Sequence, residues 1–231
     1  MEQMRGRIVL DTVQEIADPK HTALLVIDIQ NDNSAVDGFL AQHGRDISSA
    51  RRIIPRVKQV LDDARRLGLL IVFLRVTESS DGSLESDPLL RRLRRWNPSD
   101  TLSGYAREGT WGNQVLDDLE PRPNERQIIK YRSSAFIGTP LDLLLKNRGI
   151  KAAVVVGLAT EGCVETTVRD LDQYGYYPIV LRDCVASRRK ELHDAALLVM
   201  SNRYDVILSE ELLKVWHSAP SAGGPNRLQS D

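Results

Sequence analysis

The chain is poor in the residues from which metal sites and disulfide frameworks are built. It has 2 cysteines and 4 histidines among 231 residues, with no C-x-x-C pair and no closely spaced histidines. So few thiols in a chain of this length do not form a disulfide framework, and each cysteine is therefore a packing residue or a reactive group. We expect no protein-bound metal and no cofactor.

The chain also has no large excess of charge of one sign and no long apolar run. The 31 Lys and Arg residues balance 32 Asp and Glu residues, which leaves a formal net charge of -1. This balance disfavours nucleic acid and anionic membranes as partners. No run approaches the roughly 18 apolar residues of a membrane span, and the N-terminal segment MEQMRGRIVLDTVQEI lacks the apolar centre of a signal peptide. We expect a cytoplasmic protein.

The sequence does contain short apolar runs, rich in Val, Ile and Leu, that alternate with longer amphipathic segments. The runs predict strands near 23–28, 69–75, 127–130, 152–157, 177–181 and 205–208. The segments predict helices near 47–67, 83–95, 139–148, 162–173, 188–201 and 209–216. Uniformly apolar strands suit a sheet that is covered on both faces. We predict an α/β fold, a three-layer α/β/α sandwich around a six-stranded parallel sheet with right-handed crossovers.

One domain is expected to cover residues 1–217, since 42% hydrophobic residues suffice for a sizeable core. Residues 218–231, SAPSAGGPNRLQSD, are rich in Ser, Gly and Pro and are predicted to form a disordered tail. The polar segment from Glu78 to Pro123 interrupts the regular alternation. A long segment of this kind is a lid, a subunit contact or an ordinary surface loop, and the pattern leaves these three open.

Chemistry-bearing residues stand at the ends of three predicted strands. Asp28 ends the first strand, Lys130 ends the third, and Cys163 closely follows the fourth, which ends at Gly157. Ligands of an open parallel sheet bind beyond the carboxyl ends of its strands. An acid, an amine and a thiol are therefore candidates for one crevice.

Such a trio suits nucleophilic catalysis. A carboxylate can accept the thiol proton, while an ammonium and the first turn of the helix expected at 162–173 would favour the thiolate. Backbone N–H groups in the turn GLATEGC could bind an oxyanion. Taken singly, Asp28 could cap a turn, Lys130 could lie on the surface, and Cys163 could pack within a helix. Their joint placement at strand ends favours the functional interpretation.

Three segments resemble one family. ALLVIDIQND, IIKYRSSAF and VVVGLATEGCVETTVRD are similar, in this order, to the segments that hold the catalytic Asp, Lys and Cys of the isochorismatase-like cysteine hydrolases. The similarity runs from about Thr22 to about Ser209. It implies a catalytic triad of Asp28, Lys130 and Cys163 in a homo-oligomer, a dimer or a tetramer.

The resemblance also implies a mechanism. The peptide bond between Leu158 and Ala159 should be cis, and the backbone N–H groups of Ala159 and Cys163 should form the oxyanion hole. Cys163 would attack the substrate carbonyl, and ammonia or an amine would leave with a proton relayed by Asp28. Water would then release the acid from the thioester.

The expected substrate is a small linear amide or a ureido or carbamoyl compound. EGTWGNQVLDDLEPRP and TPLDLLLKNRGI resemble the ureidoacrylate amidohydrolase subgroup. The Asp-x-His motif of nicotinamidases is missing from residues 45–80, and Asn33 stands where the family often has Phe. The residues suspected of contacting substrate, each of which could equally be structural, are Gln30, Arg75, Glu78, Tyr105, Trp111, Ser134 and Phe136.

Other functions stay open. The chain could be an isochorismatase- or nicotinamidase-type hydrolase, or a catalytically silent scaffold of the same fold. The scaffold reading would predict a broken triad, and this triad is whole. A redox sensor is a further alternative, in which Cys184, at another strand end, resolves an oxidised Cys163. Cys184 follows an apolar run, VLRDC, and packing is the simpler role for it.

Overall fold

The computed structural model of the protein describes residues 1–96 and 104–218, apart from the side chain of Trp96. Six strands form one sheet in the order β5-β4-β3-β6-β7-β8, and every neighbouring pair is parallel. The predicted parallel sheet is therefore confirmed. Its strands are β3 (Thr22–Ile27), β4 (Leu70–Val76), β5 (Arg126–Lys130), β6 (Ala152–Leu158), β7 (Tyr177–Ala186) and β8 (Asp205–Ile207).

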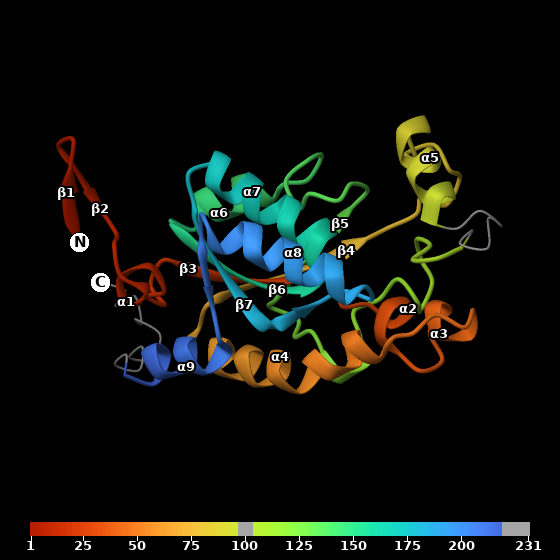
Figure 1. Cartoon of the computed structure of the whole chain (residues 1–231), viewed down its shortest axis with the longest axis horizontal. Coiled ribbons are helices and arrows are strands. Elements are labelled where there is room, and N and C mark those ends of the chain that lie inside the picture. The colour runs from red at the N-terminus through yellow and green to blue at the C-terminus, as the bar shows by residue number, and fades with distance from the viewer. Residues whose placement is uncertain (97–103, 219–231) are drawn as a thin grey trace, which may run out of the picture.

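Helices cover both faces of the sheet, as Figure 1 shows. One face carries α6 (Leu141–Asn147), α7 (Glu165–Gln173) and α8 (Lys190–Ser201), and the other carries α4 (Ser48–Leu67) and α9 (Ser209–Ser218). The central strand β3 explains why both faces are covered, because all six of its residues are buried and the apolar ones, from Ala23 to Ile27, alternate between two cores. Leu24 and Val26 pack on the α4 side, whereas Leu25 and Ile27 pack on the α7 side.

Several short elements lie outside the predicted pattern. A hairpin of β1 (Glu2–Met4) and β2 (Arg7–Val9) stands away from the sheet. Helices α1 (Val13–Ile16), α2 (Asn31–Ser34) and α3 (Phe39–Gln42) have one turn each, and η1 (Asp117–Leu119) is a single 3-10 turn. Such lengths are too short to show a periodicity in the sequence. The predicted helix at 83–95 is α5 (Asp87–Trp96).

Strands β3 and β6 approach each other most tightly at the edge where the candidate residues lie. Gly157 has φ of 128°, and a Cβ atom there would lie 2.0 Å from the carbonyl oxygen of Ile27. Only glycine adopts this conformation without a clash. The glycine thus lets β6 deliver its following turn directly beside Asp28.

The segment from Glu78 to Pro123 is partly described. Residues 97–103 of it lie outside the described residues, as does the predicted tail from residue 219 onwards, and Ser218 is the last residue of α9. The stretch from residue 104 returns to the sheet, where Val115 forms a bridge with Gln30 and Arg107 forms one with Glu78. Part of the segment from Glu78 to Pro123, which we call the excursion, therefore packs against the carboxyl ends of β3 and β4.

Candidate active site

Asp28 occupies a sharply turned position immediately after β3. Its φ is 52°, in the left-handed region, and its backbone N–H donates to the carbonyl of Leu74 at 2.9 Å. The side chain is only 4% exposed, and its Oδ1 accepts a hydrogen bond from the backbone N–H of Val76 at 2.8 Å. The neighbouring strand β4 therefore fixes the direction of this carboxylate.

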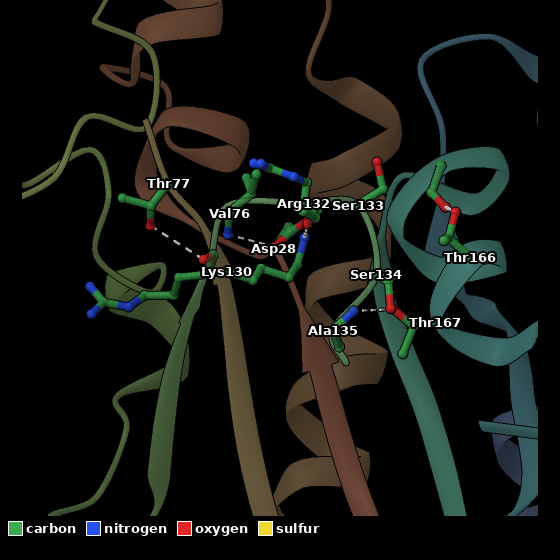
Figure 2. A network of polar contacts seen from close by, with 12 residues as sticks. Asp28, Val76, Thr77, Lys130, Arg132, Ser133, Ser134, Ala135, Thr166 and Thr167 are labelled. Atoms are coloured by element: carbon green, nitrogen blue, oxygen red, sulfur yellow. Dashed lines mark hydrogen bonds and ion pairs between the residues drawn. The ribbon is translucent and has the colours of Figure 1, made fainter. Parts of the chain in front are cut away.

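Lys130 reaches Asp28 from the far side of β4. Its Nζ lies 2.9 Å from Oδ2 of Asp28 and 3.2 Å from the carbonyl oxygen of Arg132, and its side chain is completely buried. Figure 2 shows this ammonium and carboxylate facing each other above the strand ends. Burial alone would lower the pKa of Lys130, but the charges of Asp28 and of an ionised Cys163 outweigh it and raise that pKa. The amine is therefore held as an ammonium.

Cys163 lies in a π-helical turn, Thr160–Val164, and not in the first turn of an α-helix. Gly162 has non-helical dihedral angles, φ of -111° and ψ of -108°, so that the regular helix α7 begins only at Glu165. The expected helix at 162–173 is therefore too long at its start. The Leu158–Ala159 peptide bond, which precedes this turn, is cis.

The charges of Asp28 and Lys130 both affect the pKa of the Cys163 thiol. Burial and, after it, the negative charge of Asp28 raise its pKa, Lys130 opposes both effects, and the net result is a pKa of about 12. The thiol is therefore protonated at neutral pH. The expected stabilisation of a thiolate by a helix start does not dominate here, because burial disfavours the anion more strongly.

The turn around Cys163 is closed by its own backbone. The carbonyl of Ala159 accepts hydrogen bonds from the N–H groups of Gly162, at 2.9 Å, and of Val164, at 3.2 Å. The two donors are the residues on either side of Cys163, so these bonds fix the backbone that carries the sulfur. Cys163 itself remains a partly exposed residue.

Tyr105 is brought to the same site by the excursion. Burial and then the charges of Asp28 and Cys163 raise the pKa of its phenol, so the ring lies within electrostatic reach of both groups. Its hydroxyl donates to Oδ1 of Asn33, whose Nδ2 donates to the carbonyl of Asp28 at 2.8 Å. Sequence reasoning suspected Tyr105 but did not connect it to Asn33.

The excursion is held in place by Asp32 and Asn113. Oδ2 of Asp32 accepts from the N–H of Ala106 at 2.7 Å, and a Cβ atom at Gly112 would lie 2.0 Å from its Oδ1. Asn113 Nδ2 donates to the carbonyls of Ala106, at 2.9 Å, and Val76, at 3.1 Å. Asp32 and Asn113 were not singled out in the sequence, because a polar residue that docks a distant loop leaves no periodic signal.

Two other suspected substrate residues bind the excursion itself. Gln30 is fully buried, and its Nε2 donates to the carbonyls of Val76 at 3.0 Å and of Asn113 at 2.9 Å. Arg75 donates to side-chain oxygens of Asn113 at 3.3 Å and of Gln114 at 2.8 Å. Burial lowers the pKa of Arg75. Both side chains support the loop that carries Tyr105.

Glu78 begins the segment that carries Tyr105, and Trp111 lies six residues after Tyr105. Oε2 of Glu78 accepts a hydrogen bond from the N–H of Gly104 at 2.8 Å, next to Tyr105. Trp111 is 45% exposed, and its indole N–H donates to Oδ2 of Asp117 at 3.2 Å. Glu78 thus fixes the start of the described loop, while Trp111 lies at its surface.

Ser134 and Phe136 connect the loop after Lys130 to the helix after Cys163. The Ser134 hydroxyl donates to Asp170 on α7 and accepts from the N–H of Phe136 at 3.0 Å. The N–H of Ala135 donates to the hydroxyl of Thr167, also on α7, at 3.1 Å, as Figure 2 shows. Ser134 and Phe136 are both buried. These bonds couple the positions of the amine and the thiol.

Cys184 is buried inside β7 and does not lie at a strand end. The sequence placed it at an end because the charged pair Arg182 and Asp183 interrupts the apolar run. It packs in the core on the α4 side, whereas Cys163 packs against the core on the α7 side. The sheet therefore separates the two thiols.

Residues 1–96 and 104–218 lack two kinds of functional feature. Within them, no group of three or more His, Cys, Asp or Glu side chains is arranged to hold a metal ion. No helix in this part of the chain is both long and apolar enough to cross a membrane.

Comparison with known proteins places the chain among hydrolases. Residues 22–211 match the model of the isochorismatase domain family. The chain is 33% identical over 189 residues to ureidoacrylate amidohydrolase RutB from Enterobacter sp. (strain 638), which covers 78% of this chain and 81% of that protein.

Solved structures share the fold. The cysteine hydrolase from Pseudomonas syringae pv. phaseolicola superposes with a TM-score of 0.76 at 24% identity, covering 88% of this chain and 95% of that one. N-carbamoylsarcosine amidase from Thermoplasma acidophilum gives 0.64 at 26% identity, covering 82% and 97% of the two chains. The family match spans the whole sheet and every residue of the site described above, and the chain accordingly belongs to the isochorismatase family of hydrolases.

Proposed function

We propose that the protein is a cysteine-dependent amidohydrolase that cleaves a small linear amide or a ureido or carbamoyl compound. Its catalytic residues are Asp28, Lys130 and Cys163. The observation that carries this proposal is a thiol, on a partly exposed residue, whose pKa responds to a buried carboxylate and ammonium 2.9 Å apart. A structural ion pair needs no thiol beside it, whereas nucleophilic attack needs all three groups.

The first half of the reaction forms a thioester. The Cys163 sulfur attacks the carbonyl carbon while its proton passes to Asp28, because a thiol with a pKa of about 12 is a poor nucleophile until it loses that proton. Asp28 then gives the proton to the leaving nitrogen as the carbon–nitrogen bond breaks. Ammonia or an amine departs, and the acyl group stays on sulfur.

The second half releases the acid. Water attacks the thioester carbonyl and gives a proton to Asp28, the carbon–sulfur bond breaks, and Cys163 recovers its proton. Lys130 remains an ammonium throughout and offsets negative charge, first on Asp28 and then on the sulfur as it becomes anionic. In both halves the carbonyl oxygen becomes an oxyanion, for which the N–H groups of Ala159 and Cys163 are the proposed donors.

The choice of substrate class is supported by the named relatives and by a motif that the sequence lacks. The relatives named above include a ureidoacrylate amidohydrolase and an N-carbamoylsarcosine amidase. Nothing in residues 45–80 matches the Asp-x-His motif of nicotinamidases, which disfavours nicotinamide.

A screen of ammonia release tests the proposal. The substrates are ureidoacrylate, biuret, N-carbamoylglycine, maleamate and nicotinamide, each offered to the wild type, to Cys163→Ala and to Cys184→Ala. We expect turnover of a linear amide or ureido compound that Cys163→Ala abolishes and Cys184→Ala retains. Turnover of nicotinamide alone, or equal activity of wild type and Cys163→Ala, would contradict the proposal.

A further inference from the structure

The hydrogen bonds of Asn33 determine which way its amide faces. Its Nδ2 lies 2.8 Å from the backbone carbonyl of Asp28, and its Oδ1 is bonded to the hydroxyl of Tyr105. A carbonyl oxygen only accepts hydrogen bonds, so the NH2 group of Asn33 must face Asp28. The amide oxygen is thereby left for Tyr105.

This orientation determines which atom accepts the only proton of the Tyr105 hydroxyl. Because Oδ1 of Asn33 cannot donate, the phenol must donate to it. Burial, together with the charges of Asp28 and Cys163, raises the pKa of the phenol, which stays neutral over the physiological range. Within residues 1–96 and 104–218, no group donates a hydrogen bond to the Tyr105 oxygen. The oxygen therefore retains acceptor capacity.

Tyr105 is placed where that capacity can act on a substrate. The charges of Cys163 and Asp28 both reach its phenol. The docking of Gly112 and Ala106 on Asp32 fixes the loop that carries the ring. The groups proposed to bind the carbonyl oxygen, the backbone N–H groups of Ala159 and Cys163, are donors. Tyr105 thus adds an acceptor that is unable to donate toward the substrate.

We infer that Tyr105 is a specificity-determining residue that accepts a hydrogen bond from an N–H group attached to the carbonyl that Cys163 attacks. The inference rests on the proposed function for the identity of that carbonyl. An amide or ureido N–H satisfies the Tyr105 oxygen. An ester or an N,N-dialkyl amide instead offers it an acceptor or an alkyl group and leaves it unsatisfied. Primary amides and carbamoyl compounds are therefore the preferred class.

Kinetics of Tyr105→Phe test this role, with Tyr204→Phe as a matched control. Tyr204 bonds Asp172 on the surface of α7, and its variant should behave like the wild type. We expect Tyr105→Phe to lower kcat/KM for N-carbamoylglycine and maleamate about tenfold, a factor that corresponds to about 1.4 kcal/mol. Hydrolysis of p-nitrophenyl acetate, an ester without N–H, should change less than about twofold. An equal loss for amide and ester, or no loss for either, would overturn the inference.

Binding to an inactive variant separates the inference from the proposed function. Calorimetry gives the Kd of N-carbamoylglycine and of maleamate for Cys163→Ala and for Cys163→Ala/Tyr105→Phe, without any turnover. A wild type that hydrolyses no amide would contradict the proposed function. A roughly tenfold weaker Kd in the double variant would still support the role of Tyr105. Equal Kd values, or no binding to Cys163→Ala, would overturn that role.

Discussion

The buried ion pair between Asp28 and Lys130 gives a quantitative prediction about stability. Asp28→Asn keeps an oxygen that can accept from Val76 N–H, but it leaves the Lys130 ammonium without an anion in a site where its side chain is 0% exposed. Removing one partner of a buried pair costs about 3–5 kcal/mol, because the remaining charge is uncompensated. With a urea m-value of about 3 kcal/mol/M, the unfolding midpoint should fall by about 1 to 1.7 M.

A double-mutant cycle in urea checks the origin of that loss. Lys130→Met should cost a similar amount, while Asp28→Asn/Lys130→Met should lose about 2–3 kcal/mol less than the sum of the two single changes. Lys146→Met is the control, because Lys146 pairs with Asp142 at the surface, is 59% exposed and should contribute at most about 1 kcal/mol. Single losses below about 1 kcal/mol that add without coupling would refute this reasoning.

Three more predictions concern the thiol, the excursion and the loop after the lysine. Because the folded pKa of Cys163 is about 12, above the unfolded value of roughly 8.5, its contribution to stability is complete at neutral pH and is lost as pH rises through that window. Alkylation by iodoacetamide should accordingly be slow at pH 7 and accelerate up to at least pH 10, and a plateau below pH 8 would contradict the burial argument. Gly112→Ala places a Cβ atom against the carboxylate of Asp32 and should raise KM, because the excursion then packs less tightly on Asp32. An unchanged KM would contradict the role of this contact. Ser134→Ala removes the bond to Asp170 and should lower the free energy of unfolding by about 1–3 kcal/mol. Asp170→Asn should cause a similar loss, and an unchanged free energy of unfolding in both variants would contradict this role of the bond.

The sheet and the positions of the three candidate catalytic residues could be predicted because both depend on local patterns. An apolar run predicts a strand, and the residue after it lies at the carboxyl edge of a parallel sheet. Asp28 and Lys130 follow this rule although they are 102 residues apart. No distance had to be known, since the topology brings strand ends together.

The environment of each residue could not be predicted in the same way. The protonation state of Cys163 depends on how deeply its sulfur is buried, and the π-helical turn replaces the helix start that the sequence favoured. The bond between Asn33 and Tyr105 joins residues 72 positions apart, one in a single-turn helix and the other in a turn of the loop. The hairpin β1–β2 has strands of three residues, which is too short for alternation to be recognised.

The most direct test of the central claim is the mass of the protein during turnover. The wild type is mixed with its best amide substrate, quenched in acid and measured intact, and the modified residue is then located by peptide mapping. The account predicts an added mass equal to the substrate minus the departing ammonia or amine, carried by Cys163 and absent from Cys163→Ala. Steady turnover with an adduct on Cys184 or on another residue would contradict it.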